Sequence, residues 1–236
     1  MKANNIIGIT VIFDNDASLA KNLSVDVLNV KNTKLSNLGY GGGINKRIRE
    51  AIDKGYEWFI AMNQDLKVTK SGMEKFQKIL EKSPPGIVGP FAGGLDPKRW
   101  TTILPSKNVD YISGACMAIH RDVIEKIGFF YEPYFMYYED ADYSLRAKKA
   151  GFPLIHVPVA GIAHDDTPML GKGSFLHEYY LARNHLLFVE RQAPPAVRLY
   201  EYLRLPKTMA EGLRGNRGAG AGVADYLLHR FGEKKL

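Results

Sequence analysis

The chain has 236 residues, of which 45% are hydrophobic and 24% are charged, a composition that allows a substantial core and argues against wholesale disorder. Its net charge of +7 favours anionic partners such as nucleotides or phospholipid headgroups, although solubility alone would explain the same charge. The sequence holds no Lys/Arg-rich run with interleaved aromatic residues, so we expect no nucleic-acid partner.

The only cysteine, Cys116, excludes a disulfide within the chain and favours a reduced, cytoplasmic protein. Cys116 lies in an apolar stretch and is more typical of a core residue than of a nucleophile. No apolar segment approaches the ~20 residues that span a bilayer. The apolar run 6–13 continues directly into Asp14-Asn15-Asp16 and lacks a small-residue cleavage site, so it reads as a strand rather than a signal peptide.

Apolar runs alternate with amphipathic runs through residues 1–172. In chain order, strands are expected at 6–13, 25–30, 57–62, 87–89, 110–120 and 154–157. Helices are expected at 44–54, 71–82, 121–127 and 139–150, a glycine-rich loop at 37–43 and an irregular segment at 90–108. This alternation predicts an α/β fold with a doubly wound, mainly parallel sheet. Ligands of such sheets bind beyond the carboxyl ends of the strands, where Asp14 and Asp65 fall.

The pattern changes at Gly173, after which helices are expected at 175–191, 197–205 and 223–231, with a glycine-rich segment at 212–222. We therefore predict an α/β domain at 1–172 and a helical C-terminal extension at 173–236. The extension mixes Lys and Arg with Leu, Tyr and Phe, as amphipathic helices on anionic membranes do. Packing on the core or on another subunit would explain the same pattern.

Two segments offer candidate ligands for a divalent cation. Asp65 follows a strand, where an aspartate is often a turn residue, but oxygen ligands also suit Mg²⁺ or Mn²⁺, and nucleotide phosphates would supply more of them. His164 precedes Asp165-Asp166 in a loop, and a histidine in such company is a second candidate ligand.

An acidic cluster, Glu139-Asp140-Ala141-Asp142, begins one of the expected helices. Carboxylates at a helix start complement the helix dipole, which is a sufficient structural reason for them. Their mutual repulsion, and desolvation by Tyr137 and Tyr138, would also raise a carboxylate pKa and make a better base. Asp142 is better suited to capping the helix or to pairing with Arg146 four residues on.

The glycine-rich segment 37–43 matches neither a Walker loop nor G-x-G-x-x-G. It is either a flexible turn or a place where the backbone approaches a nucleotide, with Asn45 capping the next helix.

Taken together, these segments resemble bacterial glycosyltransferases of family 2, which have the GT-A fold, and most of all their rhamnosyltransferase-like and galactofuranosyltransferase-like members. The likeness is carried by Asn37-Leu38-Gly39-Tyr40-Gly41-Gly42-Gly43-Ile44-Asn45, Asn63-Gln64-Asp65, 113–121 and 135–146, with His164 and 179–184 extending it. It covers most of residues 9–190, and the order of the motifs is more specific than any one of them.

The resemblance implies roles for particular residues. Asp65 matches the last aspartate of the family's D-x-D motif, which binds the metal on the nucleotide diphosphate, and Asn63 replaces the first. His164 matches the second metal ligand, and Asp140 matches the catalytic base of inverting members. Contacts to the nucleotide or donor are implied for Asp14, Asn37, Gly39, Asn45, Asn63 and Gln64, and contacts to the acceptor or sugar for Gly114, Glu139 and Arg183.

The expected activity is an inverting, Mg²⁺- or Mn²⁺-dependent transfer of a rhamnose-like or galactofuranose-like sugar. The donor would be a dTDP- or UDP-linked sugar, and the acceptor a hydroxyl of a glycan or lipid-linked glycan. Such an enzyme would be cytoplasmic, would contact the inner face of the membrane through its basic C-terminus, and could form a homo-oligomer.

Two alternatives remain open from the sequence. Family members usually have a further strand and helix before the turn at Asp14, and Asn63 departs from the motif, so the chain could be a nucleotide-sugar-binding module with impaired catalysis. A metal-dependent phosphohydrolase would usually need more carboxylate ligands. The enzyme hypothesis requires Asp65, Asp140 and His164 to face one cavity.

Overall fold

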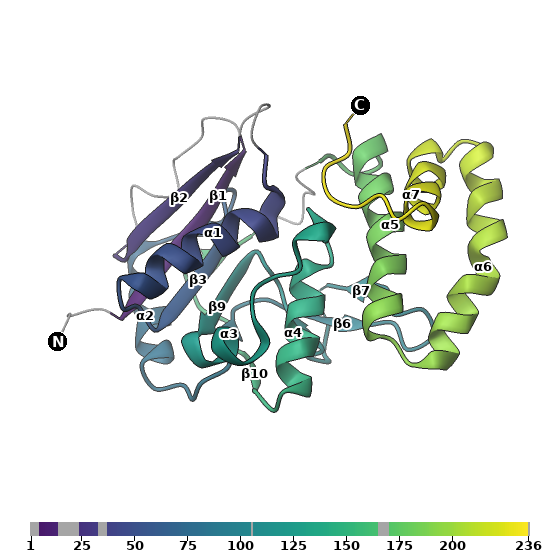
Figure 1. Ribbon diagram of the computed structural model, residues 1–236. Helices are drawn as coiled ribbons and strands as arrows, with labels where there is room; N and C mark the ends of the chain where they lie inside the picture. The colour runs from purple at the N-terminus through teal and green to yellow at the C-terminus, as the bar shows by residue number, and fades with distance from the viewer. Residues whose placement is uncertain (1–4, 14–23, 33–36, 105, 165–169, 236) are drawn as a thin grey trace.

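The computed structural model describes residues 5–13, 24–32, 37–104, 106–164 and 170–235 (Figure 1). Its main sheet has six strands in the order β10-β5-β9-β3-β1-β2. These strands are β1 (Ile6–Phe13), β2 (Asp26–Asn32), β3 (Trp58–Asn63), β5 (Ile87–Gly89), β9 (Cys116–His120) and β10 (Leu154–His156). All neighbours are parallel except β9, which runs antiparallel to β3 and β5. The predicted mainly parallel sheet is confirmed.

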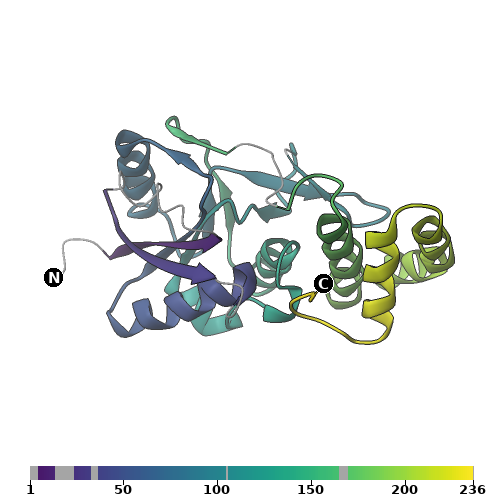
Figure 2. The same cartoon turned by 90° about the horizontal axis from the view of Figure 1, so that it is seen from above.

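Helices cover both faces of this sheet because its central strands are apolar on both faces. In β3, Phe59 and Ala61 pack toward α1 (Gly39–Asp53), α3 (Arg121–Ile127) and α4 (Glu139–Lys149). The alternate residues Trp58, Ile60 and Met62 pack toward α2 (Lys70–Leu80). Successive side chains of a strand point to opposite faces, so one continuous apolar run supplies two cores. Figure 2 shows α1 and α2 on opposite sides of the sheet.

Two smaller sheets and a short 3₁₀ helix extend this layered domain. β6 (Ala92–Leu95) pairs antiparallel with β7 (Thr102–Ile103) and with β8 (Tyr111–Ile112). β4 (Lys67–Val68) pairs antiparallel with β11 (Ile162–Ala163). The 3₁₀ helix η2 (Glu132–Tyr134) precedes the segment that leads into α4.

The C-terminal helices form a bundle beside α4, on the right of Figure 1. They are α5 (Phe175–Gln192), α6 (Pro195–Leu213) and α7 (Arg217–Leu227). Tyr138 and Leu145 share a buried cluster with Phe188 of α5 and Val223 of α7, so the bundle packs directly on the α/β part. Within the described residues, no helix has both the length and the apolar character needed to cross a bilayer.

The observed elements differ from the expected ones at several places. The segment 90–108, expected to be irregular, contains β6 and β7, which pair with each other. The segment 37–43 is not a loop, because α1 already begins at Gly39. The expected strand 110–120 is divided by a turn into β8 and β9. The glycine-rich segment 212–222 is largely helical, since α6 continues through Pro206 and α7 starts at Arg217.

Candidate active site

Asp65 and His164 are brought together by the pairing of β4 with β11. In this pairing Ala163 lies opposite Lys67, so His164 reaches the turn that carries Asp65. His164 Nε2 lies 3.1 Å from Asp65 Oδ1 and 3.3 Å from the Asn63 side-chain amide. Two residues separated by 99 positions in the chain thus present a carboxylate oxygen and an imidazole nitrogen to the same point.

The geometry of this pair fits two neighbouring ligands of one divalent cation. Mg²⁺ binds its ligands octahedrally at about 2.0–2.1 Å, so adjacent ligand atoms lie about 3.0 Å apart. The observed 3.1 Å between Asp65 Oδ1 and His164 Nε2 matches that separation. Asp65 is partly exposed, with 40% of its side chain accessible, so the outer side of the pair is open to further ligands.

Asp140 lies at the start of α4, where two backbone amides hold its carboxylate. The Gly114 N–H donates to Asp140 Oδ2 at 2.9 Å, and the Ala141 N–H donates to Oδ1 at 2.8 Å. Desolvation raises the pKa of Asp140 above its usual value, and these hydrogen bonds to the charged form offset part of that effect. The carboxylate is therefore fixed in position and more basic than an exposed aspartate.

Glu139 is buried beside Asp140, and its carboxyl group has an oxygen without a hydrogen-bond partner. The residue is 7% exposed, and Oε2 contacts no donor. Burial, together with the neighbouring Asp140 charge, raises the pKa of Glu139 to about 8. Glu139 is thus kept largely protonated at neutral pH and can donate a hydrogen bond from its carboxylic acid group.

Asp65, Asp140 and His164 line one cleft of about 380 Å³, as the sequence predicts. Its walls also include Asn63 from β3 and Glu139 from α4. The remaining lining residues are neutral or aromatic: Tyr40, Thr102, Leu104, Tyr111, Ser113, Gly114, Ala115, Met136, Tyr137, Tyr138, His177 and Leu181. Sequence reasoning missed Thr102, Leu104, Tyr111 and His177, which lie outside the segments that carry the family resemblance.

Tyr40 connects the glycine-rich start of α1 to the base. Its hydroxyl donates to the Gly114 carbonyl, and the N–H of the same glycine donates to Asp140. Burial, and after it the charges of Glu139 and Asp140, raise the pKa of Tyr40 well above its usual value, so its hydroxyl remains a donor. Gly114, an expected acceptor contact, thus positions Asp140 as well as lining the cleft.

Arg183 does not line the cleft, which corrects the expected contact to the acceptor or sugar. Its side chain is 1% exposed, and its guanidinium donates to the backbone carbonyls of Gly232, Pro133 and Tyr134. A guanidinium that is buried and occupied by three carbonyls is not available to a substrate. Arg183 instead connects the end of η2 to the C-terminal segment by donating to backbone carbonyls of both.

Asn184, the next residue on α5, holds the segment that leads to the catalytic carboxylates. Its side-chain amide donates to the carbonyls of Tyr134, Met136 and Tyr137 at 2.8, 2.6 and 3.1 Å. Tyr137 and Tyr138 have φ angles of 67° and 72°, which residues other than glycine adopt rarely and at a cost. The C-terminal helices therefore help to fix the backbone from which Glu139 and Asp140 project.

Of the residues expected to contact the nucleotide or donor, some line the cleft and others do not. Asn63 lines the cleft, whereas Gln64 lies half-buried in the following turn and outside the cleft lining. The Asn37 side chain accepts the Gly39 N–H at 3.0 Å and so helps to start α1. Asp14 lies outside the described residues.

Asn45 contradicts its expected role as a helix cap near the nucleotide. It lies inside α1, is fully buried, and exchanges hydrogen bonds with the backbone N–H and carbonyl of Phe130. Its side chain also donates to Glu132 at 2.9 Å. Asn45 thus joins α1 to the segment before η2 and cannot contact a donor.

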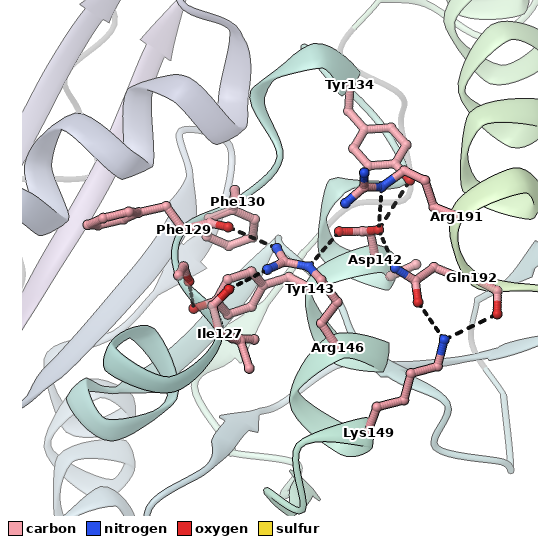
Figure 3. A network of polar contacts seen from close by, with 12 residues as sticks. Ile127, Phe129, Phe130, Tyr134, Asp142, Tyr143, Arg146, Lys149, Arg191 and Gln192 are labelled. Atoms are coloured by element: carbon pink, nitrogen blue, oxygen red, sulfur yellow. Dashed lines mark hydrogen bonds and ion pairs between the residues drawn. The ribbon is translucent and has the colours of Figure 1, made fainter.

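Asp142 serves the structural role that its position suggested. Its carboxylate is fully buried and accepts hydrogen bonds from Arg146 at 2.9 Å, Arg191 at 3.2 Å and Gln192 at 2.7 Å (Figure 3). The Arg146 pairing is confirmed. Because Arg191 and Gln192 belong to α5, this network also ties α4 to the C-terminal bundle.

Comparison with known proteins finds similarity to proteins named as glycosyltransferases. No family model matches the chain. Over 151 residues it is 28% identical to the low-salt glycan biosynthesis hexosyltransferase Agl10 of Haloferax volcanii, which covers 55% of this chain and 49% of that protein. Over 193 residues it is 29% identical to the N-acetylglucosaminyl-diphospho-decaprenol L-rhamnosyltransferase of Mycobacterium tuberculosis, which covers 64% of this chain and 62% of that protein. The chain spans less than two thirds of each of these curated relatives.

Two solved structures decide the fold. The mannosyltransferase PcManGT from Pyrobaculum calidifontis, in complex with GDP-Man and Mn²⁺, superposes with a TM-score of 0.53 at 14% identity, over 95% of this chain and 74% of that one. GalNAc-T7 with UDP, GalNAc and Mn²⁺ superposes with a TM-score of 0.60 at 11% identity, over 97% and 57%. The chain has the GT-A glycosyltransferase fold. The resemblance to rhamnosyltransferase-like members of family 2 is confirmed by the relatives named hexosyltransferase and rhamnosyltransferase.

Proposed function

We propose that this GT-A protein is an inverting, metal-dependent glycosyltransferase that moves a sugar from a nucleotide-diphosphate donor to an acceptor hydroxyl. One observation carries the proposal: a carboxylate–imidazole pair and a positioned basic carboxylate line the same cleft of about 380 Å³. The relatives named as glycosyltransferases and the fold support the same reaction class.

Asp65 and His164 would hold Mg²⁺ or Mn²⁺ through Oδ1 and Nε2, which lie at the separation of adjacent ligands. A divalent cation at this position supplies charge stabilisation to a departing diphosphate. The described residues contain no group of three His, Cys, Asp or Glu side chains that could hold a metal by themselves. Oxygens of the donor diphosphate and of water would therefore complete the coordination. This sparse ligand set also speaks against a phosphohydrolase, which usually brings more carboxylates.

Asp140 would act as the general base. Its carboxylate would take the proton of an acceptor hydroxyl while that oxygen forms a bond to the anomeric carbon and the bond from that carbon to the diphosphate breaks. Attack from the face opposite the leaving group inverts the configuration. The raised pKa of Asp140 favours proton acceptance, and a positioned base typically contributes about 10²–10⁴-fold. Glu139, largely protonated and unpartnered, would donate a hydrogen bond to a hydroxyl of the transferred sugar.

We propose a dTDP- or UDP-linked hexose donor and a glycan or lipid-linked acceptor, on the analogy of the relative named for N-acetylglucosaminyl-diphospho-decaprenol. Exposed apolar residues on α6, Leu199 and Leu203, are 60% and 73% accessible. Lys207 follows Leu203 by one helical turn on the same face of α6 and is 65% exposed, although Glu211 lies 3.9 Å from its ammonium group. Apolar and basic groups on one helix face bind anionic membranes, which supports peripheral contact with the cytoplasmic face.

This membrane contact can be tested by flotation with vesicles that contain anionic lipid. The double variant Leu199→Ser/Leu203→Ser should float less than the parent protein, because both changes remove exposed apolar area without disturbing a buried contact. Equal flotation would contradict a membrane role for α6.

We also propose that the chain divides functionally at residues 172 and 173. The first part would bind the donor and carry the reacting groups. The second part, 173–236, would fix the segment before α4 through Asn184 and provide the membrane-facing surface.

The test of the proposed function is sugar transfer by Asp140→Asn. This variant should lose at least about 10²-fold in transfer while it still binds the nucleotide, since asparagine keeps the shape but not the base. The control is Asp122→Asn on α3, whose side chain is 55% exposed and does not line the cleft, and it should keep full activity. Unchanged transfer by Asp140→Asn would refute the base assignment.

A thermal-shift screen of UDP-, dTDP- and GDP-sugars, with and without Mn²⁺, would identify the donor, because a ligand that binds only the folded state raises its stability. Metal-dependent donor binding without transfer or donor hydrolysis would instead favour a nucleotide-sugar-binding module with impaired catalysis.

A further inference from the structure

A second cavity of about 350 Å³ adjoins the cleft. Thr102, Tyr138 and Leu181 line both spaces, so these three residues form the partition between them. Leu205 and Thr208 of α6 add a wall from the C-terminal bundle. Among the described residues, none of those assigned to donor, metal or base lines this second space.

The cavity holds an ordered cluster of polar side chains. Glu201 is 3% exposed and is bound by the Arg99 guanidinium through two hydrogen bonds of 2.8 and 3.3 Å. His185, 6% exposed, places Nε2 3.3 Å from the Glu201 carboxylate and Nδ1 3.3 Å from the Tyr138 hydroxyl. The cluster therefore runs from the cavity to the partition next to the catalytic carboxylates.

We propose that this cavity is a saccharide subsite that holds the acceptor residue next to the one whose hydroxyl reacts. The inference rests on the proposed transferase function and narrows its acceptor to a glycan of at least two neutral sugars. This acceptor differs from the one in the name of the Mycobacterium tuberculosis relative, where a single sugar is joined to a diphosphate.

The chemistry of the walls favours a neutral, hydroxyl-rich ligand. Threonine hydroxyls can both donate hydrogen bonds to sugar hydroxyls and accept from them, and the Glu178 carboxylate can accept from them. Leu186, Leu205 and Val223 supply apolar surface for the C–H faces of a ring. Ligand sites commonly combine such apolar walls with a few fixed polar groups in a volume of about 300–1,000 Å³.

A phosphate group fits this cavity less well. Glu178 and Glu201 both line it and would repel an anion. The main cation, Arg99, already binds the Glu201 carboxylate with two of its nitrogens. The cavity therefore lacks the free positive charge that a diphosphate requires.

The position of the cavity suits the next residue of an acceptor. Tyr138 immediately precedes Glu139 and Asp140, and its side chain lines both spaces. A saccharide that spans the partition at Tyr138 would place one ring in the second cavity and the reacting hydroxyl beside Asp140.

The test fills the cavity without touching the cleft lining. Ala182, on α5, lines only the second cavity, so Ala182→Phe should occupy space that a sugar ring would use. Ala196→Phe makes the same change at an exposed position of α6 and is the matched control. Thr208→Val, nearly isosteric, removes one cavity hydroxyl and serves if Ala182→Phe does not fold.

Binding is measured on the full chain by saturation-transfer NMR in the presence of UDP and Mn²⁺. The probes are methyl glycosides of N-acetylglucosamine and rhamnose, and the disaccharides of these sugars in both orders. At least one disaccharide should bind about tenfold more tightly than its component monosaccharides. Ala182→Phe should abolish that advantage, Thr208→Val should reduce it, and Ala196→Phe should leave it intact.

Two results would overturn the proposal: no disaccharide advantage in the parent protein, or an advantage that survives in Ala182→Phe. Inorganic pyrophosphate is titrated in parallel without Mn²⁺, and binding that Ala182→Phe abolishes would show a phosphate site instead. UDP binding is followed in the same samples. Its absence would contradict the proposed transferase function, while the disaccharide titration would still decide the saccharide subsite.

Discussion

Replacing Asn184 by alanine should release the segment that presents the catalytic carboxylates. The Asn184 side-chain amide donates to the carbonyls of Tyr134, Met136 and Tyr137. The Tyr134 carbonyl also accepts from Arg183, so the substitution leaves the Met136 and Tyr137 carbonyls without this donor. Each hydrogen bond contributes about 0.5–1.5 kcal/mol net, and each buried carbonyl left unpaired costs about 1–3 kcal/mol. We therefore expect Asn184→Ala to lower the free energy of unfolding by about 3 kcal/mol, which a domain stable by about 5–15 kcal/mol survives.

The same substitution should affect transfer more than its stability cost implies. Tyr137 and Tyr138 each sit at positive φ, at a cost of about 1–3 kcal/mol per residue. Without Asn184, relaxation of this backbone becomes favourable, and it would move Asp140. A displacement of about 1 Å at a reacting group can cost about 10²-fold in rate, and that is the loss of transfer we expect.

A matched control separates the two effects. Asn45 is also fully buried and makes three hydrogen bonds, but to Phe130 and Glu132 rather than to the segment before α4. Asn184 makes one more, because its Oδ1 accepts from Arg183 Nε at 2.9 Å. Asn45→Ala should match Asn184→Ala in urea denaturation and keep most of its transfer rate. Hydrogen exchange of the peptide 135–141 should rise only in Asn184→Ala. Equal exchange and equal transfer in the two variants would refute this reasoning.

Three further results are expected. Tyr40→Phe should lower the transfer rate by about tenfold with little effect on nucleotide binding. The lost hydroxyl donates to the carbonyl of Gly114, whose N–H donates to Asp140. An unchanged transfer rate would contradict a role of Tyr40 in positioning Asp140. Because the pKa of Glu139 is raised to about 8, the folded state binds more protons than the unfolded state between about pH 4.5 and 8, so the free energy of unfolding should fall as pH rises through that window. Urea denaturation at several pH values measures this dependence, and Glu139→Gln should flatten it. An unaltered pH dependence in Glu139→Gln would count against the raised pKa of Glu139. Burial raises the pKa of the Cys116 thiol to about 12, so iodoacetamide should label this thiol only after unfolding. Rapid labelling of the native protein at pH 8 would disagree with the position of Cys116 in the core.

Much of the fold follows from local patterns in the sequence. The apolar run at 57–62 predicts a strand, and β3 lies at Trp58–Asn63 with its alternate residues in the two cores. The position of Asp65 at the cleft follows from the rule that ligands gather beyond the carboxyl ends of strands. These inferences succeed because periodicity and strand direction depend on neighbours in the chain. Asp140 and His164 were expected beside Asp65 because they match motifs of the family that the sequence resembles.

The failures lie where distant contacts override local propensity. Glycine in a helix interior is unfavourable, so the segment 37–43 resembles a loop. In the folded protein, Gly39 has a φ of 68°, and a Cβ there would lie 2.3 Å from the Phe135 carbonyl oxygen. Similarly, a Cβ at Gly222 would lie 2.4 Å from the Tyr179 carbonyl oxygen, so this glycine allows α7 to pack closely on α5. Such glycines are explained by tertiary approach, which no local pattern encodes.

Arg183 and Asn45 illustrate the same limit for site residues. Both are polar residues in motifs that resemble a ligand site, and both are buried against backbone groups from segments far away in the chain. A sequence shows that a residue is polar but not which buried carbonyl or amide it must satisfy. The second cavity was equally unpredictable, because Arg99, His185 and Glu201 meet only in the folded state.

The central claim is that Asp65 and His164 hold one metal ion, while the base Asp140 does not bind that ion. Titration with Mn²⁺ in the presence of UDP, followed by electron paramagnetic resonance, tests this claim most directly. Asp65→Asn and His164→Ala should each weaken Mn²⁺ binding by about 10-fold or more. Asp140→Asn should bind Mn²⁺ as the parent protein does. Equal Mn²⁺ affinity in all four proteins would contradict the account, as would a loss confined to Asp140→Asn.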